Sequence, residues 1–514
     1  MGDRRDLTEG LLFIDQYQLT MAQLYWKNGL AERSGQFDYF FRSYPDYGEH
    51  QAGYAITAGL GWLLDWLERG WFRPADRDVL AAQTNPMGTP RFDVGFLDFL
   101  AGHDGFASLR IRAVAEGRVV HANEPIAVVE GPLAVAQILE TSLLNHLNHQ
   151  TLIATKASRV VEQARGGRVL EFGMRRGPGT GANSATRASL IGGADGSSNV
   201  GVSHSLGVDP RGTHGHSMVQ LYMALGEGEI GAFRAFAELY PDECVLLVDT
   251  IDTLESGMPN AITVFEELRA RGHEPLGIRL DSGDLAYLAV RAAGMLDAAG
   301  FPTASIVLSS DLDELAMWQI REQIAEEAPR YGVTAESVLQ RLMYGVGTRL
   351  VSSHGHPALG GVYKLVAIEA EGVSVPAIKV SDTPEKVPIP GRKHLWRIYD
   401  DRGLATADVI SASDETVAPG DAITIHHPHR ATVARRLSRS EVHEVEEILE
   451  PAWDQGRRLD GNPDLDTMRQ RRVDDLARLD PGVRRLVNPH RYHVSVTTKV
   501  RDLQNRLVTE ARRE

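Results

Sequence analysis

Residues 276–299, LGIRLDSGDLAYLAVRAAGMLDAA, decide the fold that this sequence predicts. The stretch opens with a short apolar run ending at Asp281, which is typical of a strand buried on both faces. After the next three residues, apolar side chains recur at three- and four-residue steps, as in a helix that packs against a sheet. The stretch therefore predicts one βα unit.

Four other apolar runs have the same character. They lie at residues 168–173 (RVLEFG), 244–249 (CVLLVD), 305–310 (SIVLSS) and 342–347 (LMYGVG). From Asp249 through Asp281 and Ser310 to Gly347, successive run ends are 32, 29 and 37 residues apart. Each interval has room for one crossover helix, such as the periodic segment NAITVFEELRAR. This regularity favours an α/β fold with a β/α barrel over a mixed sheet.

The two ends of the chain lack this alternation. Residues 1–145 mix helical patterns with strand-like runs such as FDYFFR at 37–42, which predicts a separate N-terminal α+β domain. We assign the barrel to residues 146–365. We expect the C-terminal segment, residues 366–514, to complete or cap the N-terminal domain.

Composition excludes several classes of function. The 514 residues carry 54 Lys and Arg against 69 Asp and Glu, and the resulting net charge of -15 opposes binding to nucleic acid or to an anionic membrane surface. The lone cysteine, Cys244, excludes an intramolecular disulfide and suits a reducing compartment. No run of 18 or more apolar residues is present, so we expect a cytoplasmic protein without a membrane segment.

Polar residues follow most of the predicted strands, at the end of a barrel where catalytic groups collect. Asp252, Asp284 and Asp311 also have the ordinary explanation that they cap the next helix, and we favour it for these three.

Arg279 differs because it lies inside an apolar run, two residues before Asp281, so both side chains should point to one side of the strand. One interpretation is a buried structural ion pair. The other is a guanidinium that binds a carboxylate or phosphate at the barrel mouth, with Asp281 meeting ribose hydroxyls or a metal.

A glycine-rich stretch follows the last predicted strand. In GVGTRLVSS, Gly345, Gly347 and Thr348 could bind phosphate through backbone N–H groups and a helix N-terminus. Gly360 and Gly361 could extend this cradle or form a hairpin turn. No GxxxxGK motif occurs, so a nucleotide would have to use the same cradle rather than a P-loop.

The stretch RGTHGHS places His214 and His216 two residues apart, which on a strand would present both imidazoles to one face. The pair could hold a metal, as in barrel hydrolases. Alternatively, a single histidine could act as nucleophile or acid and base, supported by Thr213. A purely structural histidine remains open for His214.

An ordered set of motifs resembles the nicotinate phosphoribosyltransferase family, a type II phosphoribosyltransferase, across roughly residues 10–395. The motifs are FIDQYQLTMAQLYW, FDYFFR, LLNHLNHQTLIATKASR, EFGMRR, GGADGSSNV, GTHGHS, LLVDT, GIRLDSGDL, GVGTRLVSS, LGGVYKLV and EKVPIPGRK. The resemblance implies an irregular β/α barrel plus an α+β sandwich-like domain formed from both chain ends.

The same resemblance implies the first step of NAD salvage from nicotinate. Nicotinate and phosphoribosyl pyrophosphate (PRPP) would give nicotinate mononucleotide and pyrophosphate, coupled to ATP hydrolysis with Mg²⁺. The coupling would run through a phosphohistidine at His216, whereas the family does not require histidine at position 214. The metal ligands are left open.

The resemblance also implies substrate contacts. Thr213, Arg279 and Thr348 would contact nicotinate or PRPP, Phe172 would stack on the pyridine ring, and Asp281 would bind ribose hydroxyls. Tyr17 would stack from the opposite subunit, so the active site would be shared in a homodimer.

Loss of pyrophosphate builds positive charge on the ribose, which suits carboxylates near the sugar and cations near the leaving group. Asp281 and Asp249 fit the first role. Arg175, Arg279 and Mg²⁺ fit the second.

Three rival functions can be separated by experiment. A nicotinamide phosphoribosyltransferase would prefer the carboxamide base, and a metal-dependent barrel hydrolase would hold tight zinc at His214 and His216. A catalytically inactive binding protein on the same scaffold would form no product.

Overall fold

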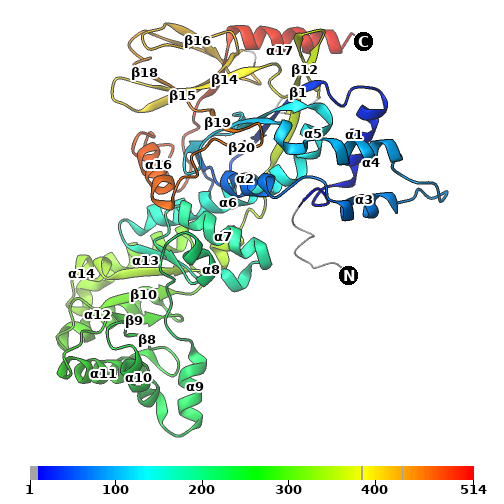
Figure 1. Ribbon diagram of the computed structural model, residues 1–514. Coiled ribbons are helices and arrows are strands. Elements are labelled where there is room, and N and C mark those ends of the chain that lie inside the picture. Colours follow the sequence, from blue (N-terminus) through cyan, green and yellow to red (C-terminus); the bar gives the residue numbers. More distant parts are fainter. Residues whose placement is uncertain (1–9, 382, 384–385, 431, 514) are drawn as a thin grey trace. The chain divides into compact units, whose positions relative to one another are not determined.

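The computed structural model describes residues 10–381, 383, 386–430 and 432–513, and the chain divides into two compact units (Figure 1). One unit is Lys156–Pro357, and the other combines Met1–Thr155 with Ala358–Glu514. Helix α6 (Glu140–Ala164) begins in the unit that contains both chain ends and continues into the unit Lys156–Pro357.

The unit Lys156–Pro357 is built on a six-stranded parallel sheet with the order β7-β6-β11-β10-β9-β8. Its strands are β6 (Arg168–Glu171), β7 (Gly196–Ser197), β8 (Val245–Leu247), β9 (Gly277–Leu280), β10 (Ser305–Ser309) and β11 (Leu342–Val346). All five predicted strands are confirmed. Strand β7 was not predicted, because two residues carry no recognisable pattern.

The strand order is that of a rolled-up barrel. The first strand, β6, pairs with the last strand, β11, which is the contact that brings the two ends of a βα array together. Among the described residues, no ladder joins β7 to β8. Instead, the backbone N–H of Arg211 donates to Ser197 O at 2.7 Å, and that of Leu247 donates to Nε2 of His214 at 3.2 Å. The extended segment 211–215 thus bonds to both sides of the opening; the predicted α/β unit with a parallel sheet is confirmed, and its closure into an irregular barrel stays a prediction.

Helices follow the strands of this unit as predicted (Figure 1). They are α7 (Gly179–Ile191), α8 (Val200–Ser205), α9 (His216–Ala224), α10 (Gly228–Leu239), α11 (Met258–Ala270), α12 (Leu285–Ala298), α13 (Glu314–Glu327), α14 (Ala335–Gln340) and α15 (Thr348–Val351). Helix α12 buries Leu285, Ala289, Val290 and Leu296 in the core of the unit, the periodicity seen in the sequence.

Two of the three predicted helix caps are confirmed. Asp284 accepts from the backbone N–H of Tyr287 at the start of α12, and Asp252 accepts from Leu254 N in the turn before α11. The prediction for Asp311 is wrong, because Asp313 caps α13. Ser310 and Asp311 instead have positive φ angles of 113° and 39°, so the backbone turns sharply after β10.

The other unit interleaves the two ends of the chain in one seven-stranded sheet, β13-β12-β1-β5-β3-β19-β20. Strand β1 (Ser34–Phe41) lies between β5 (Ala127–Pro132) and β12 (Gly361–Ala370), antiparallel to both. The remaining strands of this sheet are β3 (Arg110–Ala113), β13 (Val373–Pro376), β19 (Glu450–Asp454) and β20 (Arg457–Arg458). A domain formed from both chain ends is therefore confirmed. Around the sheet lie α1 (Gln16–Lys27), α2 (Leu60–Glu68), α3 (Pro74–Ala81), α4 (Val94–Gly102) and α5 (Leu133–Ile138) (Figure 1).

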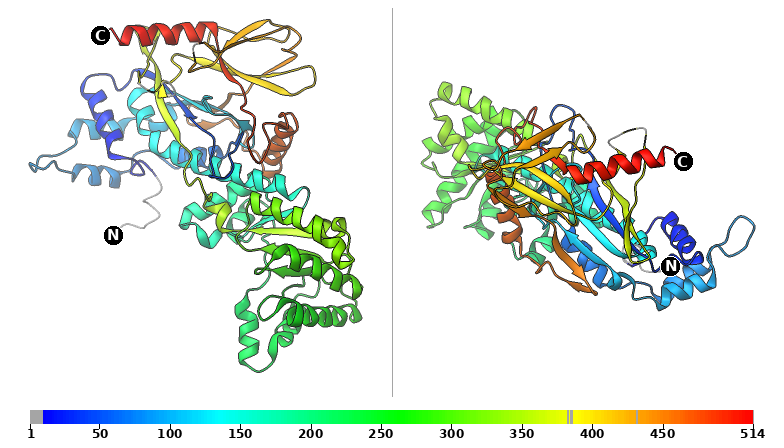
Figure 2. Two further views of the ribbon diagram at one scale, coloured as in Figure 1. Left: turned by 180° about the vertical axis from the view of Figure 1, so that it is seen from behind. Right: turned by 90° about the horizontal axis from the view of Figure 1, so that it is seen from above.

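A second sheet in this unit comes entirely from the C-terminal part of the chain, in the order β17-β16-β21-β15-β14-β18. Its strands are β14 (Lys393–Tyr399), β15 (Ala405–Ala412), β16 (Ile423–His426), β17 (Ala434–Leu437), β18 (Glu444–Glu447) and β21 (Val494–Thr497). Helix α17 (Thr498–Ala511), red in Figure 2, packs along this sheet, and α16 (Leu465–Ala477) precedes it in the chain. Strands β2 (Ala55–Ile56) and β4 (Val119–Val120) form a separate pair. None of the helices in the described part of the chain has the length and apolar character needed to cross a membrane.

Two glycines in the barrel unit allow a matched test of its packing. A Cβ at Gly257 would lie 1.8 Å from Val248 O, whereas one at Gly294 in α12 would only touch Val333 at 3.5 Å. We expect Gly257→Ala to lower the unfolding midpoint by an amount equivalent to about 1–3 kcal/mol or more. Gly294→Ala should raise it by about 0.5–1 kcal/mol, because alanine is the better helix former. Urea unfolding followed by circular dichroism measures both, and an unchanged midpoint for Gly257→Ala would contradict this packing.

Candidate active site

Parallel pairing brings the carboxyl ends of the barrel strands to one rim. In register across the sheet, Leu247 lies beside Arg279, Leu280 beside Leu308, Ser309 beside Gly345, and Val346 beside Glu171. The residues that follow these strands are therefore neighbours in space although they are far apart in the chain.

Arg279, Asp281 and Ser309 form a closed triangle of hydrogen bonds at this rim. Arg279 donates from Nε to Ser309 Oγ at 2.8 Å and from Nη2 to Asp281 Oδ1 at 3.0 Å, and Ser309 Oγ donates to the same Oδ1 at 2.6 Å. The expectation that Arg279 and Asp281 share one side of the strand is confirmed. Burial alone would raise the pKa of Asp281, but hydrogen bonds from Ser309 and Arg279 and the charge of Arg279 outweigh it and lower the pKa. Asp281 is therefore a carboxylate at neutral pH.

Asp249 is a second carboxylate at the rim, with its two oxygens in different environments. Its Oδ2 accepts from the backbone N–H of Asp281 at 3.0 Å and from Ser282 Oγ at 2.5 Å. Its Oδ1 is buried and has no hydrogen-bond partner within the described ranges of the chain. A buried carboxylate oxygen without a partner is costly, so this atom is a candidate ligand for a cation.

The imidazole of His216 faces both carboxylates. His216 is the first residue of α9, and its Nδ1 lies 3.0 Å from Thr250 Oγ1. Its Nε2 lies 3.7 Å from Asp281 Oδ2 and 4.0 Å from Asp249 Oδ1. The side chain is 38% exposed, so Nε2 is within reach of a ligand. Thr250, which positions this ring, was missed in the sequence although it directly follows Asp249.

His214 has a structural position instead. Its ring packs against Phe236, with ring centroids 4.9 Å apart, and its Nε2 accepts from Leu247 N. Burial lowers the pKa of His214 to about 4, so the ring is neutral at pH 7. The interpretation of both histidines as residues on one face of a strand is wrong, because residues 211–215 form no strand and His216 begins a helix.

The metal pair of a barrel hydrolase is not supported by this geometry. Nε2 of His214 is already used by a backbone donor. Within the part of the chain that the structure describes, neither His214 nor His216 belongs to a group of three or more metal-ligating side chains.

Phe172 adds a flat apolar surface to the rim. Its backbone N–H donates to Val346 O at 2.8 Å, and its ring carbon Cδ2 would lie 2.6 Å from a Cβ at Gly345. Glycine at 345 is thus required for this ring position. The guanidinium carbon of Arg279 lies 5.6 Å from the centre of the ring. An aromatic face beside a cation suits a planar ring that carries an anion.

Glu171, one of the polar residues expected at the strand ends but given no role there, holds the loop that carries Phe172. The carboxylate is fully buried and accepts from Gly173 N, from Thr186 Oγ1 at 2.9 Å and from Ser197 Oγ at 2.6 Å. Its place at the end of a strand was the available signal.

The remaining predicted residues lie in four places. Gly347 and Thr348 start α15, and a Cβ at Gly347 would lie 3.3 Å from Phe172 O. Thr213 lies in segment 211–215, and Arg175 is exposed in the short helical turn η3 (Met174–Arg176). Tyr17 lies on α1 in the other unit, with 49% of its surface exposed.

Comparisons with known proteins identify the family of the chain. The family model described as the nicotinate phosphoribosyltransferase N-terminal domain matches residues 12–148, and that of the C-terminal domain matches residues 392–504. A nicotinate phosphoribosyltransferase of Bacillus subtilis (strain 168) is 38% identical over 496 residues, which cover 95% of this chain and 92% of the relative. The chain belongs to the nicotinate phosphoribosyltransferase family.

Solved structures support the membership in this family. The human nicotinic acid phosphoribosyltransferase structure matches with a TM-score of 0.77 at 29% identity, covering 96% of this chain and 99% of that one. A nicotinate-nucleotide pyrophosphorylase from Pyrococcus furiosus matches with a TM-score of 0.64 at 18% identity, which shows a shared fold only.

His214 should make stability depend on pH in this family member. Its pKa is about 4 in the folded chain and about 6.5 when unfolded, so between these values the unfolded state binds more protons. Stability should therefore fall as the pH is lowered from about 6.5 to about 4. We expect His214→Gln to show a shallower fall in the urea midpoint over this range. An equal slope in both proteins would show that His214 is not held neutral.

Proposed function

We propose that this chain is a nicotinate phosphoribosyltransferase that couples phosphoribosyl transfer to ATP hydrolysis through a phosphohistidine at His216. It would transfer the phosphoribosyl group from PRPP to nicotinate, giving nicotinate mononucleotide and pyrophosphate. The observation that carries the coupled mechanism is the position of His216 Nε2 beside Asp281 and Asp249, with Nδ1 at Thr250.

The base would bind at the aromatic and cationic part of the rim. The Phe172 ring offers a stacking surface for pyridine, and Arg279 offers a guanidinium for the carboxylate. The two hydrogen bonds from Arg279 to Ser309 and Asp281 use two of the five N–H donors of a guanidinium. A carboxylate suits this cation better than a carboxamide, which favours nicotinate over nicotinamide.

The sugar would lie over the carboxylates. As pyrophosphate leaves, positive charge develops on the ribose, and the ionised Asp281 with Asp249 would stabilise it. Arg175 and Thr213 would contact the phosphates. Gly345, Gly347 and Thr348 would add backbone donors at the start of α15.

ATP would act by phosphorylating His216. The Nδ1 contact to Thr250 fixes the ring and leaves Nε2 to attack the γ-phosphorus, with ADP as the leaving group. Water would later release phosphate and restore the imidazole. A phosphoryl group carries roughly two negative charges, so its arrival next to Asp249 and Asp281 would change the electrostatics that PRPP experiences.

Mg²⁺ fits the donor atoms present at this rim. Asp249 Oδ1, which is buried and without a hydrogen-bond partner among the described residues, and Asp281 Oδ2 would hold it. The ion would neutralise phosphate charge when bound.

A homodimer would complete the site. Tyr17 is half exposed on α1, and in the proposed dimer it would stack on the base bound to the opposite subunit. The cytoplasmic location stays a prediction.

The principal test uses His216→Asn. With labelled nicotinate, PRPP and Mg²⁺, we expect ATP to raise kcat/KM of the wild type for PRPP by roughly 5- to 150-fold, the usual range for coupled sites. The variant should still form nicotinate mononucleotide in the absence of ATP. It should lose the stimulation by ATP, because asparagine at position 216 cannot accept the phosphoryl group.

His204→Asn, at an exposed position on α8, is the matched control and should behave as the wild type. Full ATP stimulation in His216→Asn would refute the phosphohistidine. If the wild type formed product from nicotinamide but none from nicotinate, the proposal that nicotinate is the substrate would be refuted.

Gly345→Ala tests the base site. The new Cβ would lie 2.6 Å from Phe172 Cδ2, so the ring must move away from the rim. We expect KM for nicotinate to rise about 10- to 100-fold, since misplacing a binding group by about 1 Å can cost that much. Gly294→Ala in α12, whose new Cβ would only touch Val333, should leave KM unchanged. Equal KM values for both variants would exclude Phe172 as the stacking surface.

A further inference from the structure

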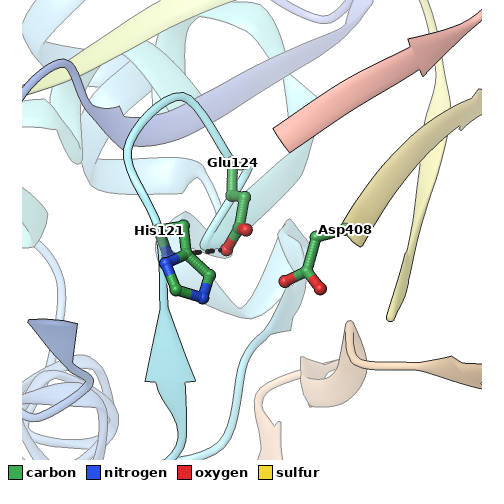
Figure 3. A group of neighbouring side chains, drawn as sticks. All are labelled: His121, Glu124 and Asp408. Carbon is green, nitrogen blue, oxygen red and sulfur yellow. Dashed lines mark hydrogen bonds between the residues drawn. The ribbon is translucent and has the colours of Figure 1, made fainter. Parts of the chain in front are cut away.

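Three potential metal ligands converge inside the unit built from both chain ends. His121 and Glu124 lie in the turn after β4, and Asp408 lies on β15 (Figure 3). All three side chains are fully buried. One ligand atom from each lies within 4.8 Å of the others.

Two atoms of this cluster have no hydrogen-bond partner among the residues that the structure describes, namely His121 Nε2 and Glu124 Oε1. The opposite atoms of the same groups are fixed. His121 Nδ1 lies 2.8 Å from the Tyr44 hydroxyl, and Glu124 Oε2 accepts from His121 N at 2.9 Å. Leaving two buried polar atoms unsatisfied in one place is costly, so something else should satisfy them.

Charge around the cluster is unbalanced. Arg397 donates to both oxygens of Asp408 and to Asp475, and Arg118 donates to Asp475 and Glu446. With Glu124, this network holds four carboxyl groups and two guanidinium groups. Of these four carboxyl groups, Glu124 is the one that accepts no hydrogen bond from a guanidinium among the described residues; it accepts from His121 N.

The carboxyl groups of Glu124 and Asp408 are close enough to share a hydrogen bond, which requires a proton on one of them. A cation bound by both carboxylates would take the place of that proton.

His121 offers the third ligand atom. In the tautomer with its proton on Nδ1, the ring donates to the Tyr44 hydroxyl and presents the lone pair of Nε2 to the cluster. Stacking on Tyr492, with centroids 3.7 Å apart, holds the ring in this orientation. A single proton on Glu124 can be donated to this nitrogen or to Asp408 but not to both, whereas a cation can bind all three groups.

We propose that His121, Glu124 and Asp408 bind a divalent transition metal, with Zn²⁺ as the first candidate. One imidazole nitrogen with two carboxylates suits zinc, whereas Mg²⁺ and Ca²⁺ prefer oxygen alone. The outer partners are those of metal sites, since Tyr44 bonds the ligating histidine and Arg397 and Tyr492 bond the ligating aspartate. Tetrahedral zinc with bonds of about 2.1 Å spaces its ligands about 3.4 Å apart, so the three atoms would close slightly on binding.

The site would be structural. It joins a turn of the N-terminal part of the chain to the C-terminal sheet, and each half alone supplies too few ligands. A cavity of about 590 Å³ is lined in part by Tyr44, Ala122, Asn123 and Tyr492, which are neighbours of the cluster residues in the chain or in contact with them. This inference does not depend on the proposed transferase chemistry.

Metal content of the purified full-length protein is the first test. After dialysis against zinc and then against buffer, we expect about one zinc per chain by mass spectrometry, and below about 0.1 in Glu124→Gln and His121→Gln. Glu446→Gln is the matched control, because it disturbs the same ion network through Arg118 without removing a ligand. It should keep its zinc.

The urea midpoint of unfolding is a second measure of zinc binding, and it needs only the wild type and two variants. Zinc should raise the urea midpoint of the chelator-treated wild type and of Glu446→Gln, but not of Glu124→Gln. Without zinc, Glu124→Gln should be at least as stable as the wild type, because it removes an uncompensated buried charge.

Three results would overturn the proposal. If the wild-type protein holds no metal and zinc, manganese and cobalt do not stabilise it, the cluster instead contains a proton that Glu124 shares with Asp408. Zinc that persists in both ligand variants would be adventitious. If Asp249→Asn loses its zinc while Glu124→Gln and His121→Gln keep theirs, the zinc is bound at the barrel rim and not at this cluster.

Discussion

Parallel hydrogen bonding among β8, β9, β10, β11 and β6 is the constraint on which the candidate active site depends. Because parallel strands end at the same edge, the pairing of Val307 with Arg279 and of Ser309 with Gly345 brings distant polar residues together. The pairing of β6 with β11 then brings Phe172 to the same rim. No single loop builds this site, so its geometry is as rigid as the sheet itself.

Electrostatics at the rim are balanced by contacts between neighbouring strands. Arg279 and Ser309 keep Asp281 ionised, and the backbone of residue 281 in turn holds one oxygen of Asp249. Within the described part of the chain, the second oxygen of Asp249 has no hydrogen-bond partner, and it lies 4.0 Å from Nε2 of His216. A site that handles phosphates and cations needs such groups to be held in place but available.

Sequence reasoning succeeded where a residue's role follows from local pattern. Arg279 and Asp281 were recognised because a charge inside an apolar run is unusual, and their spacing of two puts them on one side of a strand. The prediction of a strand containing His214 and His216 was wrong. In residues 211–215, hydrogen bonds to Ser197 and Leu247 take the place of strand pairing. Thr250 was missed, and Glu171 was expected at a strand end without a role, because a threonine or glutamate at such a position is common without function.

The sequence by itself determined the βα order, the carboxyl-end residues of each strand and the resemblance to one enzyme family, because these depend on periodicity and on motifs within short windows. Only the tertiary structure decided that His214 is buried and neutral while His216 faces Asp249 and Asp281. It alone brought His121 and Glu124 to Asp408. The physical reason is that burial and proximity arise from long-range packing, which no local pattern encodes.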